Sequence, residues 1–342
     1  MFMTANRTGW VLAAVLLVYG FVAQWRSEYV PFVLSFSLLP TLFPVRASKS
    51  SHVCVADPLV AEKQTVTDTA ESVYEKMIAE CAAATEETIS ACLVPRVVHI
   101  VWVRGTGFKY YHFLAVKSMH DRIRPDAIYI HGLEFPTDNL HFKRVMNELG
   151  AKLVKARNPD KVFDKPVMGV EHQADVIRLE TLIRFGGIYM DTDVFVLKSV
   201  DEFLNDETVM PLETTTNGLN NGIIFAKRCS RFLQALYEGY RTFNDADWGG
   251  HSILYPHWLY KQGTLGIRAE PPGLIQSEWP NSGDALFAKE FDPEYWEPVR
   301  IVHGFSRAYK NITLMNESEV IRLDNNYGRI ARNLLAGKEG IN

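Results

Sequence analysis

The sequence predicts an α/β domain with a mostly parallel central sheet, preceded by an N-terminal membrane anchor. From residue 95 onwards, short apolar runs alternate with segments of helical periodicity, which favours strands connected by helices. The apolar runs are continuous rather than alternating, as expected when helices cover both faces of a parallel sheet. Near the N-terminus, the 17 residues Gly9–Trp25 contain one strongly polar side chain. At about 1.5 Å per residue, this run nearly spans a bilayer core of roughly 30 Å.

The composition excludes several classes of protein. Of the 342 residues, 47% are hydrophobic and 22% are charged, which is typical of a folded chain and not of a disordered one. The net charge of −4 and the isoelectric point near 6.2 provide no basic excess for binding nucleic acid. Four cysteines are too few for a small disulfide-stabilised scaffold. One sizeable globular domain with appendages, or two smaller domains, remain.

We interpret the N-terminal apolar run as an uncleaved signal anchor. Arg7 precedes the run and Arg26 follows it, and Trp25 lies at its end, where membrane interfaces favour tryptophan. The positive charge of the N-terminal tail predicts a single-pass type II orientation, with residues 1–8 cytosolic, residues 9–25 in the membrane and the remainder lumenal. A cleaved signal peptide is the alternative.

Residues 26–94 are interpreted as a membrane-proximal stem. The second apolar stretch, residues 29–45, contains three prolines, which disfavour a straight spanning helix. A re-entrant segment or a second span is the alternative for this stretch. The rest of the stem is rich in Ala, Ser, Thr and Glu and contains one helical stretch near Glu71–Ala84.

Two features fit a lumenal location of the globular part. The tripeptides Asn311–Thr313 and Asn316–Ser318 are acceptors for N-glycosylation. In an oxidising compartment the four cysteines could form up to two disulfides, with three pairings open, and four buried free thiols are the alternative. These cysteines are Cys54, Cys81, Cys92 and Cys229.

The globular domain is expected to occupy residues 95–310, with residues 311–342 packing on it as a C-terminal segment. Open α/β sheets bind ligands beyond the carboxyl ends of their strands, so we expect the site there. The predicted strands are Arg96–Val103, Ala127–His131, Lys152–Lys155, Gly187–Leu197, Thr208–Leu212, Gly222–Ala226 and Val299–His303. The predicted helices are Phe113–Arg122, Phe142–Leu149, His172–Phe185, Arg231–Phe243 and Gly249–Gln262, and Pro271–Trp296 is expected to form ordered loops.

A pair of acids is the strongest candidate for chemistry. Gly186 and Gly187 can end the preceding helix, and a predicted strand containing Asp191 and Asp193 follows them. Because these acids are two positions apart in a strand, we expect both carboxylates on one face. Two acids on an otherwise apolar strand are costly unless a charge compensates them, and a hard divalent cation would do so. Solvated acids at a strand end are the alternative.

The helix before this strand carries a second candidate pair. Asp175 and Arg178 are three positions apart, so they share one helix face. An ion pair within the helix would account for them. However, this helix leads directly into the Asp191 strand, so both residues can flank the same cleft. Arg178 would then meet a diphosphate, and Asp175 would accept hydrogen bonds from sugar hydroxyls.

These motifs resemble those of the DXD-containing glycosyltransferases of family 32, which include α-1,6-mannosyltransferases and α-1,4-galactosyl- and N-acetylglucosaminyltransferases. The similarity lies in Ala-Asp-x-x-Arg, followed at fixed distance by Gly-Gly-Ile-Tyr-x-Asp-x-Asp, and extends to Val98–Trp102 and Leu219–Ile223. It implies a GT-A fold, a nucleotide-sugar donor, Mn²⁺ or Mg²⁺ as cofactor, and retention of the anomeric configuration.

The resemblance also implies roles for individual residues. Asp193 should bind the metal directly, and Asp191 should hold ribose and sugar hydroxyls or bind the metal through water. Asp175 and Arg178 should hold the donor sugar and phosphate. His303 is implied as a further metal ligand, with a plain buried histidine as the alternative. The residues implied in addition on the nucleotide or donor side are His99, Trp102, Asn220 and Asn221, with core packing as the alternative for Trp102.

The function implied is that of a Golgi membrane enzyme that moves a hexose from a UDP-sugar to a glycan or glycolipid acceptor. A GDP-mannose-dependent mannosyltransferase and an inactive carbohydrate-binding or scaffold protein are the alternatives. No sequence feature identifies a protein nucleophile, so front-face attack is expected, with the leaving phosphate taking the acceptor proton. A phosphatase with an Asp-x-Asp loop is disfavoured, because it needs Thr or Val where Phe195 stands. Acceptor-side candidates are His251, His257, Trp258 and the turn at Trp248, with core packing as their alternative.

Overall fold

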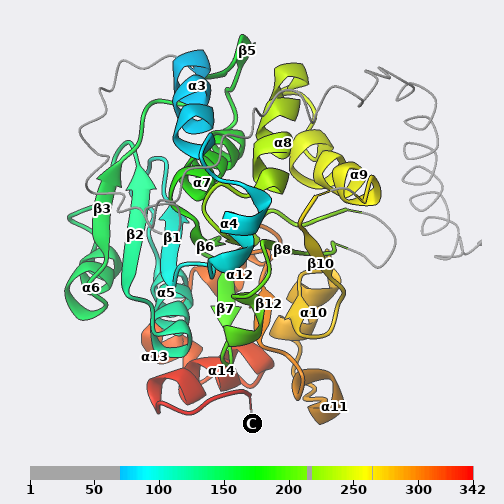
Figure 1. The fold of residues 1–342 in the computed structure, drawn as a ribbon. Helices are drawn as coiled ribbons and strands as arrows, with labels where there is room; N and C mark the ends of the chain where they lie inside the picture. Colours follow the sequence, from blue (N-terminus) through cyan, green and yellow to red (C-terminus); the bar gives the residue numbers. More distant parts are fainter. Residues whose placement is uncertain (1–69, 214–217, 264, 342) are drawn as a thin grey trace, which may run out of the picture. The chain divides into compact units, whose positions relative to one another are not determined.

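A seven-stranded sheet forms the centre of the computed structural model, which describes residues 70–213, 218–263 and 265–341 (Figure 1). The strand order is β10-β8-β9-β6-β1-β2-β3. These strands are β1 (Val97–Val101), β2 (Ala127–Gly132), β3 (Lys152–Lys155), β6 (Gly187–Met190), β8 (Thr208–Pro211), β9 (Ile223–Ala226) and β10 (Arg268–Glu270). Every strand except β10 lies within or beside a predicted strand, and β10 was not predicted.

The sheet is mostly parallel, as predicted. β3, β2, β1 and β6 pair in parallel, and so do β8 and β10. β9 alone runs antiparallel to both of its neighbours, β6 and β8. As a result β8 has the same direction as β6 and β1, and the carboxyl ends of these three strands meet at one edge of the sheet.

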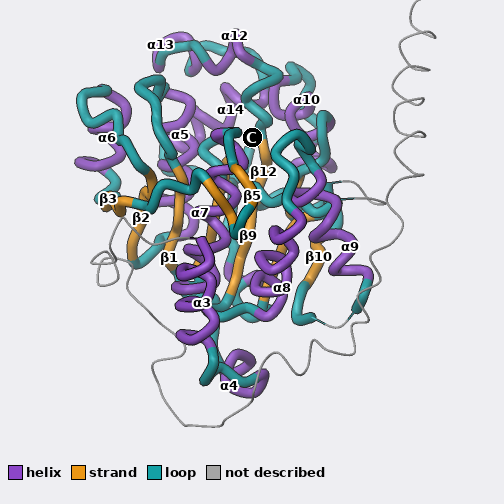
Figure 2. Tube along the Cα trace, turned by 90° about the horizontal axis from the view of Figure 1, so that it is seen from above, coloured by secondary structure: helices purple, strands orange, loops and turns teal. Residues whose placement is uncertain are grey.

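Helices cover both faces of this sheet (Figure 2). The alternation of side chains along each strand supplies two hydrophobic clusters: in β6, Ile188 and Met190 belong to one, and Tyr189 belongs to the other. The first cluster includes residues of α5 (Tyr110–Ile123), α6 (Leu140–Glu148) and α14 (Asn326–Leu335). The second includes residues of α3 (Ala70–Cys81), α7 (Val170–Phe185), α8 (Arg231–Gly239) and α9 (Tyr255–Lys261).

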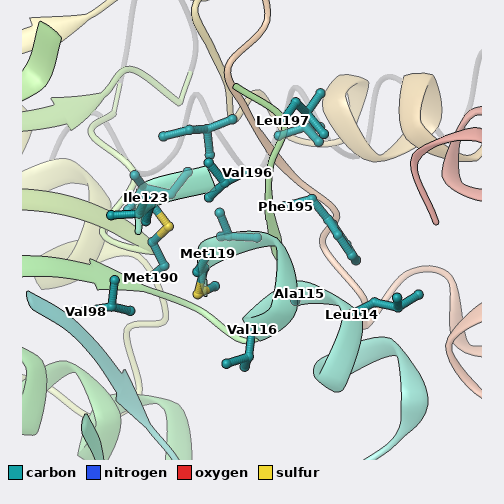
Figure 3. Close-up of a cluster of buried hydrophobic side chains, with 14 of the residues drawn as sticks. Val98, Leu114, Ala115, Val116, Met119, Ile123, Met190, Phe195, Val196 and Leu197 are labelled. Carbon is teal, nitrogen blue, oxygen red and sulfur yellow. The ribbon is translucent and has the colours of Figure 1, made fainter. Parts of the chain in front are cut away.

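A second sheet of three strands has the order β11-β12-β7, and β7 is antiparallel to β12. Its strands are β7 (Val194–Val196), β11 (Ile275–Gln276) and β12 (Ile301–His303). Figure 3 shows α5 residues such as Met119 packed in one cluster with Met190 of β6 and Phe195 of β7. α5 therefore joins the two sheets through a shared core.

The predicted single strand Gly187–Leu197 is wrong as one element. β6 ends at Met190 and β7 begins at Val194 in the other sheet, with a turn between them. The turn is closed by a hydrogen bond from the Val194 N–H to the Asp191 carbonyl at 3.1 Å. Strand alternation therefore does not place Asp191 and Asp193 on one face, because neither residue is inside a strand.

Two other segments differ from expectation in detail. The predicted helix Gly249–Gln262 is a π-helical turn, Gly250–Leu254, followed by α9. Pro271–Trp296 is not all loop, since it contains β11, α10 (Asn281–Phe287) and α11 (Pro293–Trp296). Such short elements carry too few residues for a periodic signal. The remaining α-helices and strands of the described residues are α4 (Glu86–Ala91), β4 (Lys161–Val162), β5 (Lys165–Pro166), α12 (Lys310–Thr313) and α13 (Glu317–Val320), and two short 3-10 helices span Asp201–Phe203 and Tyr240–Thr242.

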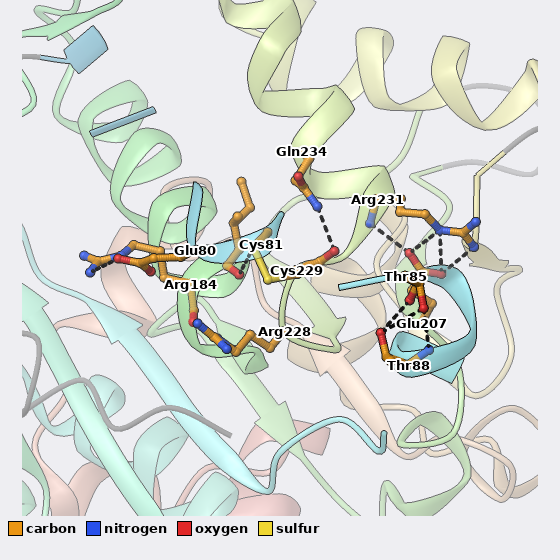
Figure 4. Close-up of a disulfide and its surroundings, with 11 residues drawn as sticks. Glu80, Cys81, Thr85, Thr88, Arg184, Glu207, Arg228, Cys229, Arg231 and Gln234 are labelled. Atoms are coloured by element: carbon orange, nitrogen blue, oxygen red, sulfur yellow. Dashed lines mark hydrogen bonds and ion pairs between the residues drawn. A yellow bond between two sulfur atoms is a disulfide. The ribbon is translucent and has the colours of Figure 1, made fainter. Parts of the chain in front are cut away.

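A disulfide links α3 to the segment just before α8. Cys81 ends α3, and its Cα lies 5.4 Å from that of Cys229, which is 148 positions later in the chain (Figure 4). Glu80 next to it pairs with Arg184 at the end of α7, at 3.1 Å. The alternative of four free thiols is wrong, since Cys92 is disulfide-bonded as well. Part of the predicted stem is thus covalently attached to the α/β unit.

The C-terminal segment also joins the core, because Tyr327 of α14 is fully buried between Tyr111 and Phe195. No helix among the described residues is long and apolar enough to cross a membrane. The predicted span at residues 9–25 and the apolar stretch at residues 29–45 lie outside those residues.

Candidate active site

Two carboxylates and one imidazole converge where β6, β7 and β12 end or begin. One ligand atom from each of Asp191, Asp193 and His303 lies within 4.8 Å of the others. Nε2 of His303 is 3.1 Å from Oδ1 of Asp193 and 4.0 Å from Oδ2 of Asp191. These three side chains form what we call the acidic cluster. Carboxylate oxygens with one imidazole nitrogen are a donor set that suits Mn²⁺, and Mg²⁺ less well because it prefers oxygen alone.

Asp193 is held in place from two sides. Its Oδ1 faces His303, and its Oδ2 accepts a hydrogen bond from the Ser306 N–H at 2.9 Å. Burial opposes its ionisation, but His303 and Ser306 outweigh that effect and hold the pKa of Asp193 below its ordinary value. Asp193 is therefore an anion with a fixed orientation.

His303 faces the carboxylates through Nε2, whereas its buried Nδ1 has no hydrogen-bond partner among the described residues. Burial lowers its pKa, but the negative charges of Asp193, Asp191 and Glu213 outweigh burial and raise the pKa above the ordinary value. A positive charge at this point is thus stabilised by the surrounding acids. This observation supports the idea that the cluster attracts a cation.

Gly222, the residue before β9, borders the acidic cluster. A Cβ atom at this position would lie 2.7 Å from Oδ2 of Asp191, 2.8 Å from Cε1 of His303 and 2.9 Å from Oδ1 of Asn220. The Gly222 carbonyl accepts a hydrogen bond from the Asp191 N–H at 2.9 Å, which fixes this close approach. Only glycine leaves room beside the carboxylates without displacing them.

Arg178 joins the second predicted pair to the first. Its Nη2 is 3.1 Å from Oδ1 of Asp175 and 3.4 Å from Oδ1 of Asp191, and its Nη1 donates to the Asn221 carbonyl at 2.7 Å. Its guanidinium carbon lies 4.4 Å from the centre of the Tyr189 ring, and the Tyr189 hydroxyl donates to Asp191. Arg178 is only 4% exposed. The predicted helix-face pair is confirmed as an ion pair, and the structure brings it to Asp191.

Asp175 is equally buried, and its Oδ1 accepts a hydrogen bond from Asn221 Nδ2 at 2.8 Å. Burial outweighs the nearby Arg178 charge and raises the pKa of Asp175 above its ordinary value. Asn221 thus binds Asp175 through its side chain and Arg178 through its carbonyl. This arrangement ties the loop before β9 to α7.

The side chain of Asn220 contacts Glu213, a residue that no sequence motif suggested. Its Nδ2 donates to Oε2 of Glu213 at 2.6 Å, while its Oδ1 accepts from the Gly222 N–H at 2.8 Å. Glu213 follows β8, whose carboxyl end lies at the same edge of the sheet as Asp191. No local motif marks this glutamate, because only the pairing of β8 with β9 brings it to the site.

His99 is not brought to this site. Its ring nitrogens lie 3.0 Å from His131 Nε2 and 3.0 Å from the Gly186 carbonyl, and the side chain is fully buried. Gly186 precedes β6, whereas Asp191 follows the other end of that strand. Burial lowers the pKa of His99 to about 4, so it is a neutral core residue. The implied nucleotide contact of His99 therefore has no support in the structure.

Trp102 follows β1 at the edge that carries Asp191. It is half-buried, donates from Nε1 to the Gly105 carbonyl at 3.0 Å and packs edge-on against Phe108 and His112. His112 in turn borders a pocket of about 400 Å³. The lining residues of this basic pocket are Lys109, His112, Ser306, Arg307, Lys310, Thr313 and Leu314. Ser306 also binds Asp193, so the pocket adjoins the acidic cluster.

Exposed tryptophans surround the same region. Trp279 is 49% exposed and packs edge-to-face with Phe305, whose ring stacks on His303 with centroids 4.0 Å apart. Trp248 is 55% exposed, and the Arg307 guanidinium lies over its ring. Core packing is therefore wrong for Trp248 and also for Trp258, which is 43% exposed. His257 is buried, in agreement with core packing.

Residues 110–210, which include Asp175, Arg178, Asp191 and Asp193, match the glycosyltransferase sugar-binding region containing the DXD motif. This segment is therefore similar to the sugar-binding region of the DXD-containing glycosyltransferases. The family resemblance inferred from the sequence is thereby confirmed for the glycosyltransferase region.

Two curated relatives share parts of the chain. Glucan organizing enzyme 1 of Cryptococcus neoformans var. grubii is 30% identical over 187 residues, covering 50% of this chain and 50% of that protein. An uncharacterised protein of Arabidopsis thaliana is 33% identical over 75 residues, covering 22% of this chain and 12% of that protein. The chain thus spans half or less of the length of these relatives.

Among solved structures, galactosyltransferase LgtC in complex with donor and acceptor sugar analogs is 13% identical, with a TM-score of 0.36. The alignment covers 60% of this chain and 86% of that chain.

Proposed function

We propose that this protein is a metal-dependent glycosyltransferase with a GT-A-type fold, which moves a hexose from a nucleotide-sugar to a glycan or glycolipid with retention. The observation that carries the proposal is the acidic cluster of Asp191, Asp193 and His303, with the buried Arg178 beside it. Carboxylates fixed around a small space, next to a guanidinium and a basic pocket, fit a diphosphate bound through a divalent cation.

Three side chains of the site would bind the cation or the donor hydroxyls. Asp193 and His303 would hold the cation directly, with Asp191 as a third ligand or as a contact to ribose and sugar hydroxyls. Mn²⁺ is favoured over Mg²⁺ because of the imidazole. When bound, the cation would neutralise charge that develops on the leaving diphosphate. Lys109, Arg307 and Lys310 of the basic pocket add positive charge on the same side.

The donor is expected to lie along the carboxyl edge of the sheet. Trp102 would stack on the base, next to the basic pocket for the phosphates. Asp175 would accept hydrogen bonds from the sugar, and Asn221 would donate them. The hydrogen bond between the two side chains holds both polar groups in place. We favour a UDP-sugar, and a GDP-mannose donor is the alternative.

A saccharide acceptor is supported by Trp279 and Trp248. Sugar rings present C–H faces that pack on exposed aromatic rings, and both tryptophans flank the segment that follows His303. An inactive carbohydrate-binding or scaffold protein is the alternative from another class. The complete set of Asp175, Arg178, Asp191 and Asp193 disfavours it, because buried charges without a function are costly.

A panel of nucleotide sugars tests the proposal. Purified protein is incubated with UDP-Gal, UDP-GlcNAc or GDP-mannose and Mn²⁺, and release of the nucleoside diphosphate is measured with and without EDTA. We expect one donor to be hydrolysed slowly in the absence of acceptor and only with the metal. No metal-dependent release from any donor would contradict the function.

For the cellular location we propose a Golgi membrane protein of type II topology, anchored by residues 9–25. The Cys81–Cys229 disulfide favours an oxidising compartment. Asn316 is exposed, and its side chain caps α13, so Ser318→Ala removes the glycosylation acceptor while keeping the cap. We expect glycosidase digestion to shift the wild-type band and to shift the Ser318→Ala band less. Digestion of the domain by protease outside sealed microsomes would contradict this topology.

A further inference from the structure

Glu213 is a half-buried carboxylate at the edge of the sheet that carries the acidic cluster. It comes two positions after β8, which is parallel to β6 because β9 runs antiparallel between them. The carboxyl ends of β6 and β8 therefore lead to the same space. Asp191 follows one of these strands and Glu213 follows the other.

The side chain of Asn220 connects Glu213 to that space. Its Nδ2 donates to Oε2 of Glu213 at 2.6 Å, and its Oδ1 accepts from the Gly222 N–H at 2.8 Å. Both ends of the amide are used, so its orientation is fixed. The space over the Gly222 Cα is bounded by Asn220 Oδ1, by Asp191 Oδ2 and by the His303 ring. Glu213 thus stands one amide group away from the acidic cluster.

Charge distinguishes Glu213 from the other acids of the site. Asp175 and Asp191 have Arg178 within 3.4 Å, and Asp193 has His303 at 3.1 Å. Within the described ranges, Glu213 has no cation within 4.0 Å and is bonded to a neutral amide. It is nevertheless near enough for its charge to act on His303. Burial raises the pKa of Glu213, whereas the Asn220 amide and the charge of His303 favour its ionised form. Among the described residues, Glu213 is thus the carboxylate of the site that is not directly paired with a basic side chain.

We propose that Glu213 is a further catalytic residue, whose carboxylate faces the anomeric carbon of the bound donor and stabilises the positive charge that develops there. The proposal rests on the proposed function. Glycosyl transfer passes through an oxocarbenium-like state, and a fixed anion in a water-poor site stabilises such a charge without reorganisation. Glu213 would thus stabilise the positive charge on the sugar, whereas Arg178 and the cation would stabilise the negative charge on the leaving diphosphate.

Transfer of the glycosyl group requires no covalent bond to Glu213. The bond between the anomeric carbon and the phosphate oxygen breaks, and its electron pair leaves with the diphosphate. The acceptor hydroxyl oxygen forms the new bond on the same face, and its proton goes to the departing phosphate oxygen. Glu213 neither gains nor loses a proton, so its contribution is electrostatic.

A structural role is the competing explanation. The Glu213 N–H donates to the Gly218 carbonyl at 3.0 Å, and its side chain anchors Asn220. Glu213→Gln separates the two roles, because glutamine has the same shape and keeps an oxygen that accepts from Asn220. Only the negative charge is lost. Glu75→Gln on the exposed surface of α3 is the matched control for the loss of one charge.

The experiment compares wild type, Glu213→Gln and Glu75→Gln in donor hydrolysis and in transfer, together with thermal unfolding and Mn²⁺ affinity. We expect Glu213→Gln to lower kcat by about 10²–10³ in both reactions. The donor KM, the Mn²⁺ affinity and Tm should stay close to wild type, and Glu75→Gln should behave like wild type. A Glu213→Gln enzyme with kcat within threefold of wild type would overturn the proposal.

A second variant covers the case in which Glu213→Gln lowers Tm. Glu213→Ala leaves a gap that formate or azide can enter, and these anions are expected to restore part of the activity, whereas they should not change the Glu75→Gln enzyme. Absence of rescue in a folded Glu213→Ala protein would count against the proposal. If wild type itself releases no diphosphate from any donor, the proposed function fails and this role fails with it. An active wild type with an active Glu213→Gln refutes this role alone.

Discussion

His303 Nε2 lies 3.1 Å from Asp193 Oδ1, although 110 positions separate the two residues in the chain. Their proximity comes from the pairing of β7 with β12, in which His303 stands opposite Val194. The Gly304 N–H adds a hydrogen bond to the Asp193 carbonyl at 2.9 Å. The backbone of the smaller sheet thus fixes the geometry of the proposed cation site.

Asp193→Asn should abolish transfer and leave the fold intact. Asparagine keeps an oxygen for the Ser306 N–H, but it removes the charge that the cation needs. The measurement is transfer rate against Mn²⁺ concentration, with thermal unfolding as the control for folding. Turnover of Asp193→Asn equal to that of wild type at limiting Mn²⁺ would contradict the assignment of Asp193 as a metal ligand.

Gly222→Ala should reduce activity by at least tenfold, because the added methyl group would lie 2.7 Å from Asp191 Oδ2 and push it out of place. Gly249→Ala is the matched control, since its Cβ would meet no atom closer than 3.6 Å. The two variants are compared by kcat and by Mn²⁺ affinity. Equal activity of both variants would show that the space over Gly222 is not used.

Arg178→Lys should lower kcat/KM by about 10²–10³, since lysine cannot reproduce the planar contacts to Asp175, Asp191 and a phosphate. Because this arginine is buried, some stability will be lost too, on the order of 1–3 kcal/mol. Arg157→Lys is the matched control: Arg157 pairs with Glu180 at a mostly buried position outside the site. Assays are run well below both Tm values.

Asp175→Asn tests the same pair from its acidic side and should also lower activity. If the loss of activity in these variants merely follows the loss of stability, as expected for Arg157→Lys, the pair is structural.

Removal of the Cys81–Cys229 disulfide should destabilise the protein. The bond closes a loop of 148 positions, and the chain-entropy estimate for such a loop is about 5 kcal/mol, with about 2–5 kcal/mol typical of measured losses. The double variant Cys81→Ser, Cys229→Ser is compared with wild type by thermal unfolding. An unchanged Tm, or a wild-type protein in which these thiols react with a labelling reagent, would contradict the prediction.

Trp279→Ala should raise the acceptor KM about tenfold or more and leave donor hydrolysis unchanged, since the ring packs on Phe305, which in turn stacks on His303. Trp258→Ala is the control, because this comparably exposed ring packs on Tyr255 of α9 instead. An equal effect of both substitutions on acceptor KM would remove Trp279 from the acceptor site.

Local patterns were sufficient for much of the fold and part of the site. The continuous apolar runs predicted β1, β2, β6, β8 and β9 because both faces of these strands are buried. β3 was also predicted, although it is an edge strand with two exposed lysines. The spacing of Asp175 and Arg178 predicted their ion pair, since three positions along a helix bring side chains together.

Other features depend on tertiary contacts that no local pattern encodes. Asp191 and Asp193 lie near each other because a turn passes the chain between two sheets, and strand alternation gave the wrong reason for their proximity. Glu213 and Ser306 reach the site through strand pairing alone. The choice of Cys229 as the partner of Cys81 follows from the packing of α3, which the sequence assigned to a stem.

The position of the acidic cluster between the two sheets has a mechanical consequence. Asp191 follows a strand of the seven-stranded sheet, whereas Asp193 precedes β7 and His303 ends β12 in the three-stranded sheet. A cation held by all three side chains would act as a cross-link between the sheets, adding about 2.7 kcal/mol to the stability when its concentration is 100 times its dissociation constant. The backbone amide hydrogens of Val194–Val196 and Ile301–His303 would then exchange with solvent more slowly. Binding of the cation at the donor site would therefore also stabilise the attachment of the smaller sheet to the larger one.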